Sequence, residues 1–460
     1  MPQPSTSPPS TSPRSSSPPT SNHASSPDAE EHPEDEITRL RRIIKGYELG
    51  QAAEGRKRKS SGNKVGQPGR GFRQLVTLFD TPNLVIYKAE RYLERHRATE
   101  RRQTDPNTAE DELEDLESNT LTTEEKQSRD RDEYRAYMAY RSFHALIPGL
   151  KEKLGGLDED GLDSYLLTVW IPAKQIVVLT VTQISHAGDA AKNTNTSDIR
   201  AAVARWINQE IDEDAMRNPD ERQPRHLEPE TRMFRGLAHD KTGAYLCPVD
   251  LDGNWDEESF RGRVRNNEPG AQISSSWFFR ALYATGSGHK DDIETGFLRG
   301  PLLVKTAQYI FTSPSSVKET DDENSPPSKK AKVDRRSSAR SDVAHRRGMD
   351  GQMTPRAIAY CAVLLHFNLT DCDKWPQDGM YMAFNYNGLY NFVVDYFEQD
   401  ATDEADKQHV SELLSWWNSQ VFPNSVKSTS ITTVQSANKL AAQRAARRAT
   451  SGHGDGTAAS

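Results

Sequence analysis

Only 34% of the 460 residues are apolar and 27% are charged, whereas ordinary globular domains are about 45–50% apolar. A sizeable part of the chain therefore cannot bury enough apolar surface to become ordered, and we expect one main folded body rather than several domains. Three cysteines give no disulfide framework, no apolar run is long enough to span a membrane, and the first residues lack the apolar stretch of a secretory signal. These features favour a soluble intracellular protein.

The N-terminal part is predicted to alternate between unstructured and helical segments. Residues 1–36 are rich in serine and proline and contain almost nothing that a core could bury, so we expect a disordered tail. In residues 37–53, apolar side chains at three- and four-residue steps predict a short amphipathic helix, which either forms a coiled coil or docks on the main body. A basic, glycine-rich linker over 54–73, a helical hairpin over 74–104 and an acidic linker over 105–121 are expected to follow.

The fold class that we predict is mostly α: a single irregular multi-helix domain with a disordered N-terminus, internal loop and C-terminal tail. The main helical domain is expected to comprise residues 122–312 and 349–425. The basic residues 313–348 are expected to form a disordered insert within this domain. Residues 426–460 are rich in Ser, Thr and Ala and are expected to form a loose tail.

Local capping signals place the starts of several helices. Pro82, Pro301 and Pro355 each stand where a first helical residue is expected, because proline lacks the amide hydrogen that this position leaves unpaired. A Thr-x-x-Glu capping box begins at Thr122 and precedes a long predicted helix. The last two predicted helices are GLYNFVVDYFEQ and KQHVSELLSWWNSQVF.

Two segments are ambiguous by pattern. Residues 162–184 follow helical spacing but include the β-branched run IVVLTV, and we predict a helix with a break near Pro172. A polar loop is expected next, leading to another helix with Ser197 as its N-cap. Residues 212–232 are predicted to be a connector, and HDKTGAYLCPV is predicted to form a β-hairpin that turns at residues 241–243.

No catalytic residue, cofactor or metal site is predicted, and enzymatic activity is not expected. An enzyme with a metal site built from acidic residues is the least favoured alternative. Asp250, Asp252 and Asn254 stand at the first, third and fifth positions of a calcium-binding loop. Trp255 and Arg261, however, occupy the positions that need Gly and Glu, so an Asp-Gly turn is the better interpretation. The thiols and imidazoles lack the closely spaced cysteine pair of a zinc site. This set consists of His239, Cys247, Cys361, His366 and Cys372.

Two Lys/Arg-rich clusters lie in segments that we expect to be exposed. By composition each resembles a nuclear localisation signal, although such clusters also occur as solubilising loops or as salt-sensitive contacts to nucleic-acid phosphates. Ser325 and Ser338, which flank the second cluster, are candidates for phosphorylation, which would partly cancel its charge and tune import. The cluster residues are Arg56, Lys57, Arg58 and Lys59, and Lys329, Lys330, Lys332, Arg335 and Arg336.

The function that these features favour is a non-enzymatic nuclear protein-interaction module, with unknown protein partners and a nuclear import receptor. The alternative is a nucleic-acid-associated protein that uses its basic arms for weak, non-specific binding, and the cytoplasm is the alternative location. No membrane contact is predicted. The aromatic residues of the last helices are expected mainly in the core, with some forming a partner-binding groove. They are Phe384, Tyr386, Tyr390, Phe392, Tyr396, Phe397, Trp416 and Trp417.

Four blocks of the C-terminal half resemble a known family. They are RGLAHDKTGAYLCPVD, GFLRGPLLVKTAQYIFTSPSSV, MTPRAIAYCAVLLHFNL and FNYNGLYNFVVDYFE, with a variable loop between the second and third. These blocks resemble an uncharacterised domain family expanded in mushroom-forming (basidiomycete) fungi, over roughly residues 130–400. The resemblance implies a fungal origin and a link to multigene or mobile-element loci, and it provides no catalytic residue. It also implies that the loop with Lys329 is an insert within one domain.

Overall fold

A computed structural model describes residues 66–104, 121–147, 172–273, 277–314, 317, 343–376, 379–381 and 384–423. Contacts divide the chain into two units, Met1–Gly62 and Asn63–Ser460, and all described residues belong to the second. Some of the predictions from sequence fall outside the described residues. These are the predictions for residues 1–36, 37–53 and 426–460, and for all but the last residue of 105–121.

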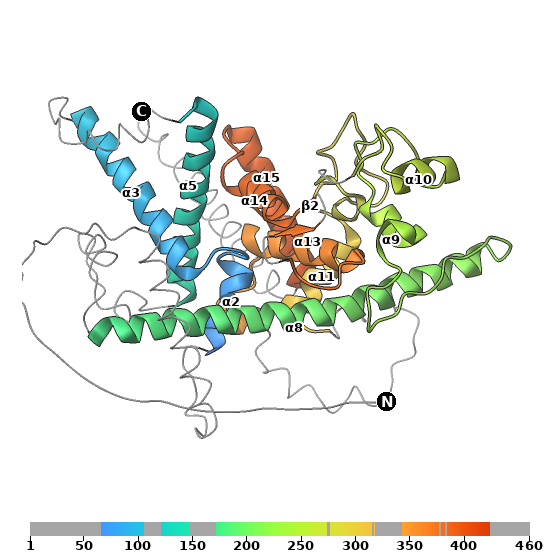
Figure 1. Cartoon of the computed structure of the whole chain (residues 1–460), viewed down its shortest axis with the longest axis horizontal. Coiled ribbons are helices and arrows are strands. Elements are labelled where there is room, and N and C mark those ends of the chain that lie inside the picture. The colour runs from blue at the N-terminus through green and yellow to red at the C-terminus, as the bar shows by residue number, and fades with distance from the viewer. Residues whose placement is uncertain are drawn as a thin grey trace, which may run out of the picture. The chain divides into compact units, whose positions relative to one another are not determined.

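The described residues are mostly helical, which confirms the predicted fold class (Figure 1). Among them, only β1 (Met380–Tyr381) and β2 (Phe384–Asn385) form a sheet, as an antiparallel pair. Two short 3₁₀ helices are η1 (Gly236–Ala238) and η2 (Arg280–Leu282). The α-helices are α2 (Gly66–Leu75), α3 (Pro82–Thr104), α5 (Thr123–Leu146), α8 (Pro172–Arg217), α9 (Asp240–Leu246), α10 (Glu258–Arg265), α11 (Pro301–Phe311), α12 (Val343–Arg346), α13 (Pro355–Leu369), α14 (Tyr386–Glu398) and α15 (Glu404–Val421).

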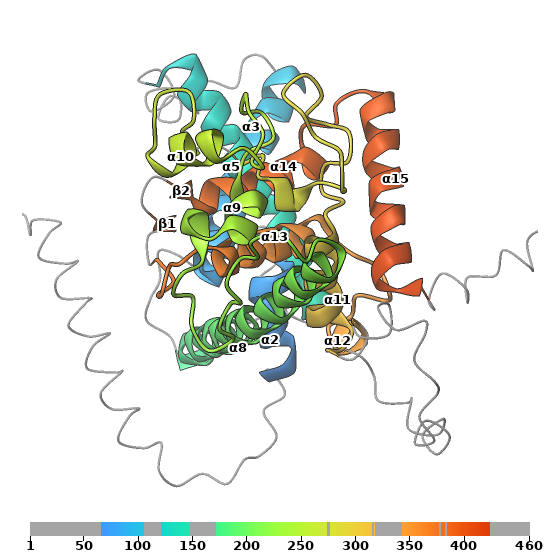
Figure 2. The ribbon, with the colours of Figure 1, turned by 90° about the vertical axis from the view of Figure 1, so that its right-hand side faces the viewer.

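Helix α13 is the centre of the fold. Every residue from Arg356 to Leu369 is buried, so this helix is covered on all its faces. Helices α2, α8, α9, α11 and α14 pack around it, as Figure 2 shows. Thr354 caps its N-terminus by accepting a hydrogen bond from the amide of Ala357, and Pro355 is its first residue. This start agrees with the prediction from sequence.

Helix α2 packs closely against the long helix α8. Two glycines allow this approach, because a Cβ at Gly188 would lie 3.0 Å from the Cγ of Arg73. A Cβ at Gly69 would in turn lie 3.0 Å from the Cβ of Ala187. Arg73 is 6% exposed and donates a hydrogen bond to Asp189 at 2.9 Å, which ties the two helices together.

Two segments that were expected to be flexible are partly helical. Residues 66–73, within the predicted linker 54–73, form most of α2, because their glycines permit close packing. The predicted insert 313–348 ends earlier than expected. Helix α12 begins at Val343, and Arg347 is buried with 8% of its surface exposed.

The polar loop predicted before Ser197 is wrong, because α8 is continuous over Pro172–Arg217. Some of its polar side chains are hydrogen-bonded within the helix, as where the hydroxyl of Thr194 donates to the carbonyl of Ala190 at 2.9 Å. Others bond to neighbouring helices, as where the side-chain amide of Asn195 donates to the hydroxyl of Tyr360 at 3.0 Å. Packing against α2 and α13 stabilises a helix that these residues would not favour alone. The helix also takes in the first residues of the predicted connector 212–232.

The predicted β-hairpin at residues 241–243 is also wrong. The segment forms α9, and a ring nitrogen of His239 accepts a hydrogen bond from the amide of Thr242 at its start. Gly243 suggests a turn in the sequence, but in the fold it makes room for a tryptophan. A Cβ at this position would lie 2.2 Å from Cζ2 of Trp255.

Capping signals locate the other helix starts correctly. Helices α3 and α11 begin at Pro82 and Pro301, and α14 and α15 cover the last two predicted segments. The capping box is present, since the amide of Thr122 donates to the carboxylate of Glu125 at 2.8 Å and the Glu125 amide donates to the Thr122 hydroxyl at 3.2 Å. The hairpin predicted over 74–104 forms differently, because α3 packs mainly against α5, beside which it lies in Figure 1.

Candidate functional site

The predicted localisation and phosphorylation residues lie outside the described residues. This holds for both basic clusters, Arg56–Lys59 and Lys329–Arg336, and for Ser325 and Ser338. Their roles stay predictions from sequence.

The five thiols and imidazoles considered for a zinc site are all buried, namely His239, Cys247, Cys361, His366 and Cys372. Cys361 and His366 lie on α13 in the main core, and the His366 ring stacks on that of Phe384 with 3.8 Å between centroids. Burial raises the pKa of Cys247 to about 11 and lowers the pKa of His366 to about 3, so both side chains are neutral at pH 7. In the part of the chain that the structure describes, no three His, Cys, Asp or Glu side chains are grouped so as to hold a metal ion.

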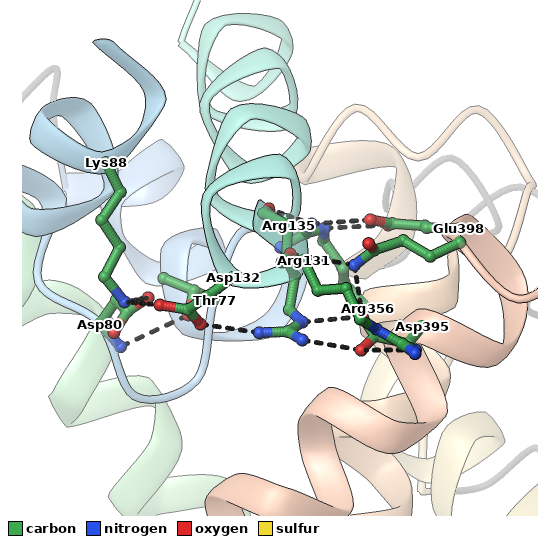
Figure 3. A network of polar contacts seen from close by, with 10 residues as sticks. Thr77, Asp80, Lys88, Arg131, Asp132, Arg135, Arg356, Asp395 and Glu398 are labelled. Atoms are coloured by element: carbon green, nitrogen blue, oxygen red, sulfur yellow. Dashed lines mark hydrogen bonds and ion pairs between the residues drawn. The ribbon is translucent and has the colours of Figure 1, made fainter. Parts of the chain in front are cut away.

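A network of charged side chains connects α3, α5, α13 and α14, and Figure 3 shows it from close by. It brings together residues that are up to several hundred positions apart in the sequence, which sequence patterns do not reveal. We call it the Arg356 network. Its members are Asp80, Lys88, Arg131, Asp132, Arg135, Arg356, Asp395 and Glu398.

Arg356 is the most buried member, with 2% of its surface exposed. It donates two hydrogen bonds to the carboxylate of Glu398, at 3.1 and 2.8 Å. Its other donors reach the carbonyl of Val76 at 2.6 Å and the carbonyl of Arg135 at 2.8 Å. One side chain thus joins α13 to α14, to the residue after α2 and to α5.

Arg135 connects the two halves of the network. It donates two hydrogen bonds to Asp395 on α14, at 2.8 and 2.7 Å, and a third to Asp132 at 2.8 Å. Lys88 of α3 donates to the other oxygen of Asp132 at 2.7 Å. The guanidinium of Arg135 and the carboxylate of Asp395 are both planar, and they must be aligned to form two hydrogen bonds. This pair therefore fixes the direction of α5 relative to α14.

Burial disfavours the ionised form of two carboxylates in the network. It raises the pKa of Glu398, and the attraction of Arg356 opposes this only in part. It also raises the pKa of Asp80, with Lys88 opposing. Because desolvation outweighs attraction at both carboxylates, the ion pairs fix the positions of the helices more than they add to the free energy of unfolding.

A small polar cavity lies within the network. Its volume is about 30 Å³, which accommodates roughly one or two water molecules. Ligand pockets are usually about ten times larger, from roughly 300 Å³. The cavity therefore suits ordered water rather than an organic substrate. Its lining residues are Thr77, Asp80, Lys88, Asp132, Arg135, Ala136, Ala139, Arg356, Asn387, Tyr390 and Asn391.

Two further arginines are buried with only neutral acceptors among the described residues. Arg232 donates to the side-chain oxygen of Asn368 at 3.1 and 2.9 Å, and Arg235 donates to the carbonyl of Asn368 at 2.7 Å. Asn368 lies at the C-terminal end of α13, where the helix dipole favours positive charge. Desolvation lowers the pKa of each arginine to about 10.

The aromatic residues of the last helices divide into two groups. Phe392, Tyr396 and Trp416 are half-buried at the border of the core. The guanidinium of Arg299 lies over the ring of Trp416, 5.3 Å from its centroid. We call these four residues the aromatic edge. The buried group, which agrees with the expected core role, comprises Phe384, Tyr386, Tyr390, Phe397 and Trp417.

Sequence reasoning assigned no role to Arg356, Arg232 or Arg235. A signal for Arg356 was present, because a charged residue in the first turn of the apolar block TPRAIAYCAVLLHF needs a partner if that helix is buried. The partner residues could not be found this way, since they lie far away in the sequence.

These features describe an α-helical domain built around a buried helix whose charges are satisfied internally. The model of a family of unknown function, DUF6698, matches residues 186–422, and the chain belongs to this family. No curated protein and no solved structure matches the chain significantly. The expected membership of a family without known function is confirmed. The matched residues begin and end later in the chain than the expected range of roughly 130–400. Helices α2, α3 and α5 precede the matched residues.

A search of the described residues for a helix with the length and apolar character of a membrane span finds none.

Replacing Arg356 by methionine is predicted to lower the free energy of unfolding by about 3–5 kcal/mol, because Glu398 is then buried without its charged partner. Glu398→Leu alone should have a similar effect. The double variant R356M/E398L should lose at least about 1 kcal/mol less than the sum of the single variants, since no unpaired charge remains. Denaturant unfolding of the four proteins measures this coupling.

The matched control is Arg217→Met, which removes an exposed arginine that pairs with Glu213 along α8. This change is expected to stay within about 0.5 kcal/mol. Additive losses in R356M and E398L would show that the two side chains are not coupled, and the network would then lack its central pair.

Proposed function

We propose that the chain is a non-enzymatic protein-interaction module that acts in the nucleus. The observation that carries this proposal is the guanidinium of Arg299 over the ring of Trp416 in the aromatic edge. Arginine and tryptophan are the residue types that most often dominate the free energy of binding at protein interfaces. Both residues are half-buried, which lowers the entropy cost of ordering their side chains when a partner binds.

The guanidinium of Arg299 is available to a partner. Among the described residues its contacts are the ring of Trp416 and the charge interaction with Tyr396, and it has no side-chain hydrogen bond or ion pair there. Its N–H groups can therefore meet a carboxylate or carbonyl of another protein. The contrast with the Arg356 network, where every charged group has an internal partner, supports an intermolecular role for this arginine.

The nuclear part of the proposal rests on the sequence alone. The cluster at Lys329, Lys330 and Lys332 and the cluster at Arg56–Lys59 have the composition of import signals. The fungal origin that the resemblance implied is a separate prediction and does not bear on the aromatic edge.

Arg299→Gln is predicted to weaken binding to the protein partner at least tenfold, about 1.4 kcal/mol, while the free energy of unfolding changes by no more than about 0.5 kcal/mol. Arg217→Gln, at an exposed arginine of α8, is the matched control and should bind like the wild type. Affinity purification from nuclease-treated nuclear extract, followed by titration of each variant with the recovered protein, measures the difference.

Equal affinity of Arg299→Gln and the wild type would remove the aromatic edge from the proposed interface. Recovery of partners that disappears on nuclease treatment would favour the nucleic-acid alternative instead.

Replacing Lys329, Lys330 and Lys332 together by alanine is predicted to reduce nuclear accumulation of a fluorescent fusion, and replacing Arg56–Lys59 as well is predicted to abolish it, because the import receptor recognises the clustered charge. Ser325→Asp with Ser338→Asp should reduce accumulation, since added negative charge cancels part of the cluster. Fluorescence microscopy of these variants measures the nuclear fraction. Unchanged accumulation in the variant that lacks both clusters would contradict the localisation proposal.

A further inference from the structure

The loop between α8 and η1 turns two apolar side chains outward. Met233 is 58% exposed and Phe234 is 53% exposed, which is unusual for residues of this size in the described part of the chain. Their neighbours on both sides, Arg232 and Arg235, point the other way and are 5% and 1% exposed. Two buried arginines thus flank two exposed apolar residues.

The two arginines hold this loop in place. Arg235 donates to the carbonyls of Arg200 and Glu228, both at 3.0 Å, and to that of Asn368 at 2.7 Å. Arg232 is bonded to Asn368 as well, and its guanidinium lies 4.3 Å from the centroid of the Phe367 ring. The loop is therefore fixed to α8 and α13 by its own side chains, and the exposed pair does not need to pack to keep its position.

The backbone at Phe234 is strained. Its φ is +65°, in the left-handed region that residues with a Cβ disfavour and that bulky residues rarely adopt. Glycine would suit this position better, and the exposed ring of Phe234 is not part of either hydrophobic core. Because the fold gains little from this exposed side chain, the strained backbone is a reason to look for a role in binding.

The surroundings indicate what kind of partner fits. The guanidinium of Arg225 lies over the Phe234 ring, 4.8 Å from its centroid, and one of its nitrogens donates to Glu228 at 3.0 Å. Its remaining N–H groups face outward on a side chain that is 62% exposed. An apolar ring and thioether beside a partly free guanidinium match an apolar pocket with a carboxylate at its rim.

We propose that Phe234, with Met233 beside it, inserts into an apolar pocket of a protein partner while Arg225 pairs with a carboxylate at the rim of that pocket. This contact uses the loop after α8, so it extends the proposed interaction function to a second surface, on elements other than those of the aromatic edge.

The charge of the loop disfavours two other occupants. The exposed charged residues of the loop, residues 218–235, are four acidic residues, Asp220, Glu221, Glu228 and Glu230, and two arginines, Arg222 and Arg225, while Arg232 and Arg235 are buried. The loop therefore lacks the run of positive charge that binds nucleic-acid phosphates or anionic lipid headgroups, whereas Arg225 alone can pair with a single carboxylate. Two apolar side chains also bury too little surface to hold a protein at a membrane.

The first test measures the fold. Phe234→Gly in the full chain is expected to keep the melting temperature or to raise it, by roughly 2 °C, because the left-handed backbone is relaxed. A fall of more than about 2 °C would show that the ring supports the fold, and the proposal would be wrong.

The second test identifies and measures the partner. Phe234→p-benzoylphenylalanine in the full chain is irradiated in nuclear extract, with Met216→p-benzoylphenylalanine as the control at a methionine that is 82% exposed on α8. A protein crosslinked only from position 234 is then purified and titrated. Phe234→Gly should weaken its binding at least tenfold, and Met216→Ala should leave the binding unchanged.

Several outcomes would overturn the inference. They are the absence of a specific crosslink, a crosslink to a second copy of this chain, equal affinity of Phe234→Gly and the wild type, or Phe234-dependent binding to vesicles of phosphatidylcholine and phosphatidylserine. Binding that is lost in Arg299→Gln but kept in Phe234→Gly would leave the proposed function standing and remove only this second surface. Loss in Phe234→Gly alone would support this contact without the aromatic edge.

Discussion

A positive charge buried at the start of an apolar helix is the constraint on which the rest of the fold depends. Helix α13 is covered on all sides, and Arg356 in its first turn is 2% exposed. A buried guanidinium is tolerated only when acceptors surround it. Glu398 provides a carboxylate, and Val76 and Arg135 provide carbonyls. Helices α14, α2 and α5 must therefore be in place before α13 can be fully buried.

Because of this requirement, the cooperative folding unit begins before the first residue of the family match. The family match starts at residue 186, but two of the acceptors of Arg356 come from residues before it. Helix α2 also fills the surface of α8 and α13 through close contacts at its glycines. The matched residues alone would leave Arg356 with Glu398 and expose the surface under α2. We therefore infer that α2, α3 and α5 belong to the same cooperative unit as the family domain.

Local signals in the sequence predicted where several helices begin, but they did not predict contacts between segments that are distant in the chain. Helix starts at Pro82, Pro301 and Pro355 were predicted correctly, because proline and threonine act on their own turn. The continuity of α8 was missed, since α2, which packs against it, comes from a distant part of the sequence. Gly243 was misinterpreted for the same reason, because the tryptophan that requires it is close only in space. The sequence predicted that some aromatic residues of the last helices form an interface, but it could not show which of them remain partly exposed.

Native-state hydrogen exchange of the full chain tests the central claim most directly, because it reports the free energy of opening for each helix. The account predicts that amides of α5 and of α13 exchange with the same free energy, and that Arg356→Met lowers both by the same amount. Exchange of α5 through a smaller opening that leaves α13 protected, and that Arg356→Met does not change, would contradict it.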